Sequence, residues 1–216
     1  MLDELLNHLV RFKAEDQAAE EVAIIAWSVA VLDLKRVDVY DWLMRALDQH
    51  ITSLEANFRR QVHQFLLTCE LNGFPAHDAS SRDALRSRGV MSLNKWREEE
   101  SVGNDAKSCV DKDRRLRYQD EVRADYGTTA GNHRSSRLQR DVALILAEMR
   151  IGFEEEFVDE KSGYSVDIML SDKRTAIEVD GPSHYAAGSR RRLGNTNMKH
   201  RHLAQLGFDL RILPYW

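Results

Sequence analysis

The first 72 residues of the chain contain neither glycine nor proline. A stretch of this length without either residue predicts helices, because strands need tight turns between them and such turns favour glycine and proline. Apolar residues also recur there at the spacing of amphipathic helices, in four segments: residues 2–10, 22–32, 39–47 and 58–69. Asp38 is the expected N-cap of the third helix, and Asn72-Gly73 is expected to end the fourth. We therefore predict an α-helical region over residues 1–75.

Two of these helical segments resemble each other weakly. Residues 24–34 align with residues 61–71 at an offset of 37 residues. Paired helices with such a period are typical of α-solenoid repeats, although two copies do not establish an array. A plain four-helix packing unit explains the same pattern, and both alternatives remain open from the sequence.

Composition narrows the class of protein. The 216 residues are 43% hydrophobic and 31% charged, which is typical of a globular protein with a core. The two cysteines, Cys69 and Cys109, are too few for a disulfide scaffold or a four-ligand zinc site. No apolar stretch reaches the roughly 20 residues of a membrane helix. Asp3 and Glu4 stand where a targeting presequence would be basic, so we expect that such a segment is already removed or was never present.

Charge is distributed unevenly along the chain. The net charge is −4, yet residues 148–180 carry 4 Lys/Arg against 10 Asp/Glu, whereas residues 181–216 carry 6 against 1. A basic C-terminal end favours an anionic partner there. Residues 76–133 are polar and charged with no sustained apolar face, and we expect a linker or extended segment, with one short charged helix near residues 113–126 as an option.

Regular patterning returns at residue 135. A helix over residues 135–152, capped by Ser135-Ser136, is expected to precede a strand pair, a third strand, a second helix and a last strand. The expected ranges of these later elements are residues 153–157, 164–170, 175–179, 197–206 and 208–213. This order predicts a small α/β domain. The chain as a whole is thus predicted to be a two-part α+β protein, with helices first and an α/β domain second.

The third strand carries two acids. In the stretch TAIEVDGPSHY, alternation places Glu178 and Asp180 on one side and Ile177 and Val179 toward the core. Asp167 on the preceding strand is expected opposite the pair, and three converging carboxylates would suit magnesium or manganese. Acids at strand ends also cap helices, pair with arginine or face water, and chemistry alone favours such a structural role.

The C-terminal motifs resemble the RAP domain, the "RNA-binding domain abundant in apicomplexans". The resemblance covers residues 135–216 and rests on EVDGPSH, on the LGxTxxK stretch, on LGF and on ILPYW, the LGxTxxK residues being Leu193, Gly194, Thr196 and Lys199. It implies a RAP domain over residues 134–216. The N-terminal helices are similar to the degenerate helical repeats that often precede this domain in organellar RNA proteins.

The resemblance also implies a fold and a possible catalytic site. RAP domains resemble the PD-(D/E)xK nucleases, and carried over to this chain the two acids of that motif are Asp167 and Glu178, with magnesium as the ion that they would hold. The motif then requires a lysine where this chain has Asp180. A carboxylate cannot supply the positive charge of that lysine beside a phosphate, so the motif is degenerate here. Lys199 or His184 would have to replace it.

RNA contact is expected from the residues that follow the acidic strand. Arginine and lysine bind phosphates, and aromatic rings stack on unpaired bases. The candidates for phosphate contact are Arg190, Arg191, Arg192, Lys199, His200, Arg201 and His202, and those for stacking are Tyr185, Tyr215 and Trp216. Arg114, Arg115 and Arg117 of the charged middle segment are expected to lie along the RNA. Without the resemblance, these residues slightly favour a solvated basic loop and core aromatic residues over RNA contact.

Three functions follow as hypotheses. The resemblance implies an organellar protein, mitochondrial or alternatively of a plastid. The first hypothesis is a non-catalytic RNA-binding component of a ribonucleoprotein such as the mitochondrial ribosome, which contacts rRNA and partner proteins and no membrane. The second is a magnesium-dependent endoribonuclease of organellar RNA processing. The third is a helical scaffold that uses residues 1–73 for protein contacts.

Overall fold

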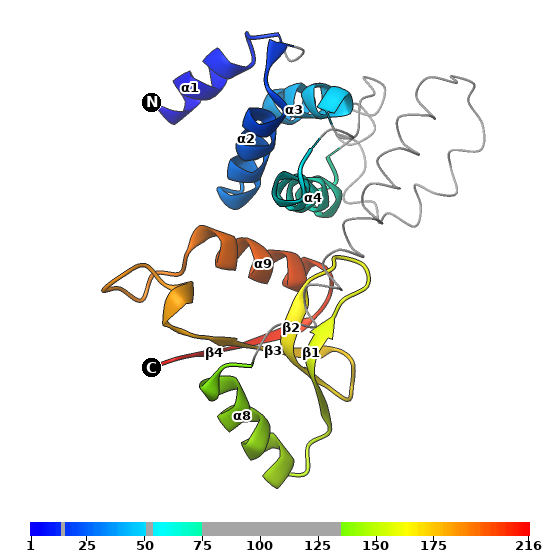
Figure 1. Ribbon diagram of the computed structural model, residues 1–216, viewed down its shortest axis with the longest axis vertical. Coiled ribbons are helices and arrows are strands. Elements are labelled where there is room, and N and C mark those ends of the chain that lie inside the picture. Colours follow the sequence, from blue (N-terminus) through cyan, green and yellow to red (C-terminus); the bar gives the residue numbers. More distant parts are fainter. Residues whose placement is uncertain (14–15, 51–53, 75–134) are drawn as a thin grey trace, which may run out of the picture. The chain divides into compact units, whose positions relative to one another are not determined.

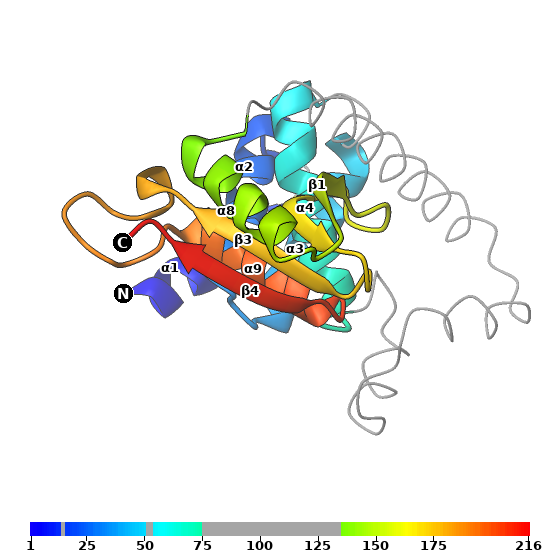
Figure 2. The same ribbon diagram turned by 90° about the horizontal axis from the view of Figure 1, so that it is seen from below.

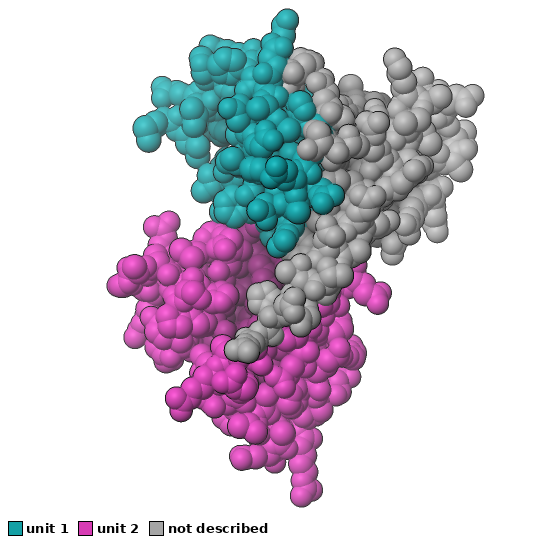
Figure 3. Space-filling view, viewed as in Figure 1, with its two compact units in different colours: residues 1–120 teal, residues 121–216 magenta. Residues whose placement is uncertain are grey.

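The chain divides into two compact units, residues 1–120 and residues 121–216 (Figure 3). The computed structural model describes residues 1–13, 16–50, 54–74 and 135–216. The predicted linker at residues 76–133, with its three arginines Arg114, Arg115 and Arg117, lies outside the described residues. Each unit is therefore described by itself.

The first unit is helical, as its lack of glycine and proline predicts. Its described helices are α1 (Leu2–Leu9), α2 (Ala19–Val31), α3 (Val37–His50) and α4 (Ala56–Leu71) (Figure 1). Helix α4 ends at Asn72-Gly73 as expected: Gly73 has a φ of +68°, and the Phe74 amide donates to the carbonyl of Cys69 at 2.9 Å. None of the described helices has the length and apolar character needed to cross a bilayer.

The prediction that Asp38 is the N-cap of its helix is wrong. Helix α3 begins at Val37, so Asp38 lies in its first turn. There its carboxylate accepts hydrogen bonds from the guanidinium of Arg36. An acidic side chain is favourable in a first helical turn as well as at the cap, because it faces the positive end of the helix dipole. The sequence therefore gives the start of the helix only to within a residue or two.

Tryptophan and tyrosine side chains link the helices of this unit. The indole nitrogen of Trp27 on α2 donates to Gln64 Oε1 on α4 at 2.7 Å. On α3, Tyr40 stacks on Phe65 with 5.3 Å between ring centroids and on Phe74 with 4.1 Å. Helix α2 packs against both α3 and α4, which accounts for its apolar sequence. A helical unit is thus confirmed, and its relation to solenoid repeats stays a prediction.

The second unit is a four-stranded sheet with a helix on each face (Figures 1 and 2). Its elements are α8 (Arg137–Glu148), β1 (Phe153–Val158), β2 (Ser165–Leu170), β3 (Thr175–Asp180), the short 3₁₀ helix η2 (Pro182–His184), α9 (Gly194–Gln205) and β4 (Asp209–Pro214). Strands β1, β2 and β3 form an antiparallel meander, and β4 pairs with β3 in parallel after the crossover through α9. Strand β4 therefore lies at an edge of the sheet. The predicted small α/β domain is confirmed.

Helix α8 covers one face of the sheet. Its apolar stripe, which includes Ala143 and Leu146, packs against Ile168 of β2 and against Ile177 and Val179 of β3. The helix starts as predicted, because the Ser136 hydroxyl accepts a hydrogen bond from the Gln139 amide at 3.1 Å. The other face carries α9, which begins at Gly194, three residues before the predicted start. The first turn of α9, GNT, is polar, and the sequence alone predicts a loop there.

Candidate functional site

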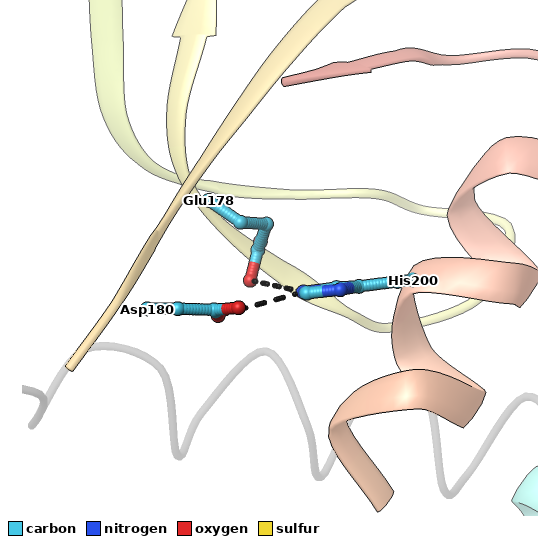
Figure 4. A group of neighbouring side chains, drawn as sticks. All are labelled: Glu178, Asp180 and His200. Carbon is cyan, nitrogen blue, oxygen red and sulfur yellow. Dashed lines mark ion pairs between the residues drawn. The ribbon is translucent and has the colours of Figure 1, made fainter. Parts of the chain in front are cut away.

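Strand β3 presents its two acids to helix α9. The alternation expected from the sequence holds: Ile177 and Val179 face α8, whereas Glu178 and Asp180 project from the opposite side toward α9 (Figure 4). Glu178 is 2% exposed and Asp180 is 1% exposed. Open water thus does not stabilise this carboxylate pair, and neighbouring cationic groups take its place.

Glu178 is paired with lysine. The Lys199 ammonium on α9 donates to Glu178 Oε2 at 2.7 Å. Burial raises the pKa of the Glu178 carboxyl above its ordinary value, Lys199 opposes this rise, and the nearby charge of Asp167 adds to it. Lys199, which the sequence offers as a replacement for the missing nuclease lysine, therefore reaches the acid that it would have to serve.

Asp180 lies among several donors. One of its oxygens, Oδ2, accepts from the Tyr185 hydroxyl at 3.2 Å and lies 3.5 Å from Arg192 Nε. The other, Oδ1, lies 3.6 Å from His184 Nδ1. Burial alone would raise the pKa of Asp180, but the imidazoles of His200 and His184 and the Tyr185 hydroxyl hold it below its ordinary value.

The Asp167 side chain is hydrogen-bonded to the backbone of the sheet. The β2–β3 ladder pairs Ile168 with Ile177 and Met169 with Ala176. Next to this ladder, Asp167 Oδ2 accepts from the Val179 amide at 2.6 Å, so that a side chain satisfies this backbone donor. Burial raises the pKa of Asp167, and the hydrogen bond from Val179 and the charge of Lys199 oppose the rise. In the described part of the chain, Asp167 makes no hydrogen bond to Glu178, but its charge adds to the rise in the pKa of Glu178.

His200 joins the two acids. Its Nε2 lies 3.6 Å from Asp180 Oδ1 and 3.9 Å from Glu178 Oε2 (Figure 4). From the sequence, His200 is expected only among the basic residues that contact phosphate. Its position four residues after Thr196 and three before Leu203, both buried, could have placed it on the inner face of α9.

The loop between β3 and α9 carries two of the predicted arginines at its tip. Tyr185 and Arg192 form an isolated bridge, and the Ala186 amide donates to the Arg191 carbonyl at 2.8 Å. Between them, Gly188 has a φ of +70°, a backbone conformation that glycine adopts without strain. The loop is therefore a hairpin-like turn that leaves Arg190 and Arg191 exposed.

Arg190 lies against the aromatic end of the chain. Its guanidinium carbon is 5.1 Å from the ring centroid of Trp216, a cation–π distance. Tyr215 and Trp216 are 44% and 49% exposed, with 5.0 Å between their ring centroids. We refer to Arg190, Arg191, Tyr215 and Trp216 as the arginine–aromatic surface.

Other predicted RNA contacts occupy different places. Tyr185 is buried beneath Tyr215 and Trp216, and its hydroxyl is used by Asp180, so its ring offers no open surface for a base. His202 is fully buried and shares a hydrogen bond of 2.9 Å with the Tyr164 hydroxyl. The expectation of RNA contact at these two residues needs correction, because both side chains belong to the core of the unit. Arg192, Lys199 and Arg201 are partly exposed.

Comparison with known protein families identifies one domain of the chain. The RAP domain profile matches residues 177–216. The chain carries a RAP domain. The match runs from β3 through the arginine loop and α9 to the last residue, so the RAP domain contains Glu178, Asp180, His200 and the arginine–aromatic surface. The predicted resemblance is thus confirmed, over a shorter range than the one proposed from the sequence.

A curated relative has the same domain. The chain is 34% identical over 76 residues to a protein of Oryza sativa subsp. japonica described as "RAP domain-containing protein, chloroplastic". The alignment covers 35% of this chain and 12% of the relative. The similarity therefore concerns about a third of this chain and does not extend to the whole relative.

Proposed function

We propose that this chain is an organellar RNA-binding protein and a non-catalytic component of a ribonucleoprotein such as the mitochondrial ribosome. The observation that most supports this proposal is the arginine–aromatic surface of the RAP domain, where Arg190 lies over the exposed indole of Trp216. Guanidinium groups bind phosphates, and exposed aromatic rings stack on bases. Such a surface suits single-stranded or looped RNA, which offers both groups at once.

The proposed organelle rests on the family and on the relative. The rice relative is described as chloroplastic, which supports an organellar location and keeps the plastid open beside the mitochondrion. The ribosomal role is tested by sedimentation of organelle lysate. The protein should migrate with rRNA at low salt and be released at high salt. Protein that stays free of rRNA at low salt would overturn the ribosomal role.

RNA binding itself is tested by replacing Trp216. Loss of a stacking ring costs about 1–3 kcal/mol per base, so Trp216→Ala should weaken binding of fluorescent single-stranded RNA in an anisotropy titration by about 5- to 150-fold. Arg211→Ala is the matched control, because Arg211 is an exposed arginine of the same domain that pairs with Asp209 outside this surface. Equal affinity of the wild type and Trp216→Ala would contradict the proposed interface.

A magnesium-dependent endoribonuclease is the second candidate. Two observations favour it. Lys199 contacts Glu178, and Asp167 is close enough for its charge to act on Glu178, so the residues of the degenerate nuclease motif lie near one another. Asp167 and Glu178 would hold the ion, with Lys199 or His184 as the helper. Against it, Asp180 occupies the lysine position of that motif. Structured RNA incubated with Mg²⁺ distinguishes the two. Cleavage by the wild type that is lost in Asp167→Asn supports the enzyme, and no cleavage by either supports binding alone.

A further inference from the structure

We propose that Glu178, Asp180 and His200 form a binding site for a divalent transition-metal cation, Mn²⁺ or Zn²⁺. The three residues come from both sides of one interface within the RAP domain, two from strand β3 and one from helix α9. One ligand atom of each lies within 4.8 Å of the others. The proposal does not depend on RNA binding, because the arginine–aromatic surface contributes none of these side chains.

The spacing of the ligand atoms suits a shared ion. Metal–ligand bonds of about 2.0–2.2 Å to nitrogen and oxygen place neighbouring ligand atoms roughly 3–4 Å apart. His200 Nε2 lies 3.6 Å from Asp180 Oδ1 and 3.9 Å from Glu178 Oε2. Both distances are too long for hydrogen bonds and within the range that a bridging cation requires.

Unsatisfied buried atoms are the second, independent observation. Glu178 Oε1, Asp180 Oδ1 and both ring nitrogens of His200 are buried without a hydrogen-bond partner. The three residues are 2%, 1% and 6% exposed. Buried polar atoms are nearly always hydrogen-bonded, and an ion is one of the groups that satisfies those that are not. The Nε2 nitrogen of His200, which lies near both acids and makes no hydrogen bond, is the ring nitrogen that a metal would bind.

The surrounding contacts would orient the ligands. The Tyr185 hydroxyl binds Asp180 Oδ2 and leaves Oδ1, the oxygen near His200 and His184, without a hydrogen bond. On Glu178, Lys199 binds Oε2, and Oε1 is the oxygen without a hydrogen-bond partner. Metal-binding carboxylates are commonly held in this way by a second group. Asp167 lies outside the cluster, and its Oδ2 is engaged by the Val179 amide. The site therefore differs from a magnesium site formed by Asp167 and Glu178.

The donor set points to the class of metal. Carboxylate oxygens suit Mg²⁺, Mn²⁺ and Ca²⁺, whereas imidazole nitrogen suits Zn²⁺ and other transition metals. One imidazole with two carboxylates thus favours Mn²⁺ or Zn²⁺ over Mg²⁺. The competing explanation is an ion-pair network without metal, in which His200 lies between the two acids. These explanations predict different results in a titration.

The test is metal binding by the full chain after removal of bound metal with a chelator. Mn²⁺ is titrated with the free ion followed by electron paramagnetic resonance, and Zn²⁺ by competition with a coloured chelator. We expect one ion per chain in this site. His200→Gln should weaken it at least about tenfold, since loss of an outer-shell partner alone costs about 10–100-fold. His8→Gln is the matched control, because His8 is an exposed histidine of the first unit, and it should leave the affinity unchanged.

A second variant guards against loss of folding. Asp180→Asn keeps the shape of the side chain and an oxygen for the Tyr185 hydroxyl but removes the charge, so it should also lower the affinity for the metal ion. Asp167→Asn should leave this affinity unchanged. Circular dichroism checks that each variant is folded. Binding that is unaffected in both His200→Gln and Asp180→Asn, absence of a one-to-one complex, or Mg²⁺ binding as tightly as Mn²⁺ and Zn²⁺ would each overturn the proposal. Failure of the RNA titration would leave this result intact.

Discussion

Lys199 and Glu178 show how strongly a single buried contact can affect the RAP domain. The carboxylate is almost fully enclosed, whereas the lysine keeps a quarter of its side chain in solvent. The pair is thus asymmetric, because removal of the lysine leaves a charge that cannot reach water. The cost of burial appears in the raised pKa of Glu178.

Removal of this lysine should destabilise the domain. Breaking a buried ion pair from one side costs about 3–5 kcal/mol, so Lys199→Met should lower the hydrogen-exchange free energy of β3 and α9 amides by about 3 kcal/mol. The double variant Lys199→Met/Glu178→Gln should recover part of the loss, since no buried charge remains unpaired. Lys173→Met, which breaks the exposed pair with Glu154, should cost under about 1 kcal/mol. Equal losses at both lysines would contradict this account.

Asp172 predicts a pH dependence of stability. Its carboxylate accepts from the amides of Arg174 and Thr175 and from the Thr175 hydroxyl in the turn between β2 and β3. These hydrogen bonds lower the pKa of Asp172 below its ordinary value of 3.8. A lowered pKa stabilises the fold above the ordinary value, and this stabilisation disappears as pH falls through the lowered value.

Asp172→Asn should therefore melt below the wild type at pH 6, and the difference should shrink as the pH is lowered below about 3.8. Melting curves measured from pH 6 to pH 3 give the comparison. A difference in melting temperature that stays constant over this range would show that the charge of Asp172 does not support the turn.

Helix α8 depends on its packing against the sheet and on its N-cap. The helix is short, and its inner face packs on the sheet through a few apolar residues, among them Ala143 and Leu146. Its start depends on one hydroxyl, since Ser136 satisfies the Gln139 amide. Helices of this length gain much of their stability from packing and from their caps.

Ser136→Ala should destabilise α8 by about 1 kcal/mol, the usual cost of losing a serine N-cap. Hydrogen exchange of the first amides of α8 measures this directly. Ser135→Ala is the control, because the Ser135 carbonyl that accepts from Arg140 is a backbone group and is retained in the variant. A similar loss in both variants would argue against a specific cap at Ser136.

The helices and strands were predictable from the spacing of apolar residues and from glycine, proline and capping residues, because these signals lie within each segment. The four N-terminal helices, α8 and the order of strands follow from local spacing and from residues such as Ser136 and Gly73. The alternation of β3 likewise placed Glu178 and Asp180 on one face. The burial of these acids was not predictable in this way, because α9 covers them and its facing residues depend on the crossover between β3 and β4. The same limit applies to Tyr185, which is buried by residues at the far end of the chain.

At the scale of the whole molecule, charge is segregated along the chain. The chain is acidic overall, but residues 181–216 carry 6 Lys/Arg against 1 Asp/Glu. Two of these cations, Arg190 and Arg191, are exposed on one loop, whereas Lys199 and Arg192 lie beside the buried acids. RNA affinity should therefore depend on few cations rather than on the net charge.

The salt dependence of RNA binding tests this distribution. For single strands, the slope of log affinity against log salt is about −0.7 for each phosphate neutralised. The double variant Arg190→Gln/Arg191→Gln should therefore reduce the slope by about 1.4, whereas Arg211→Gln should leave it nearly unchanged. The measurement is anisotropy at a series of KCl concentrations. A slope reduced as much by Arg211→Gln would mean that the domain attracts RNA through its overall field.

The edge position of β4 has a consequence for self-association. An edge strand has backbone amides and carbonyls on one side that another chain can pair with, and proteins commonly discourage this with charged residues. Asp209 and Arg211 are exposed on β4 and pair with each other, while Leu213, further along, is 40% exposed. The Asp209–Arg211 pair thus disfavours strand addition at one end of β4. Another chain would pair most readily with the segment around Leu213, at the other end of this strand.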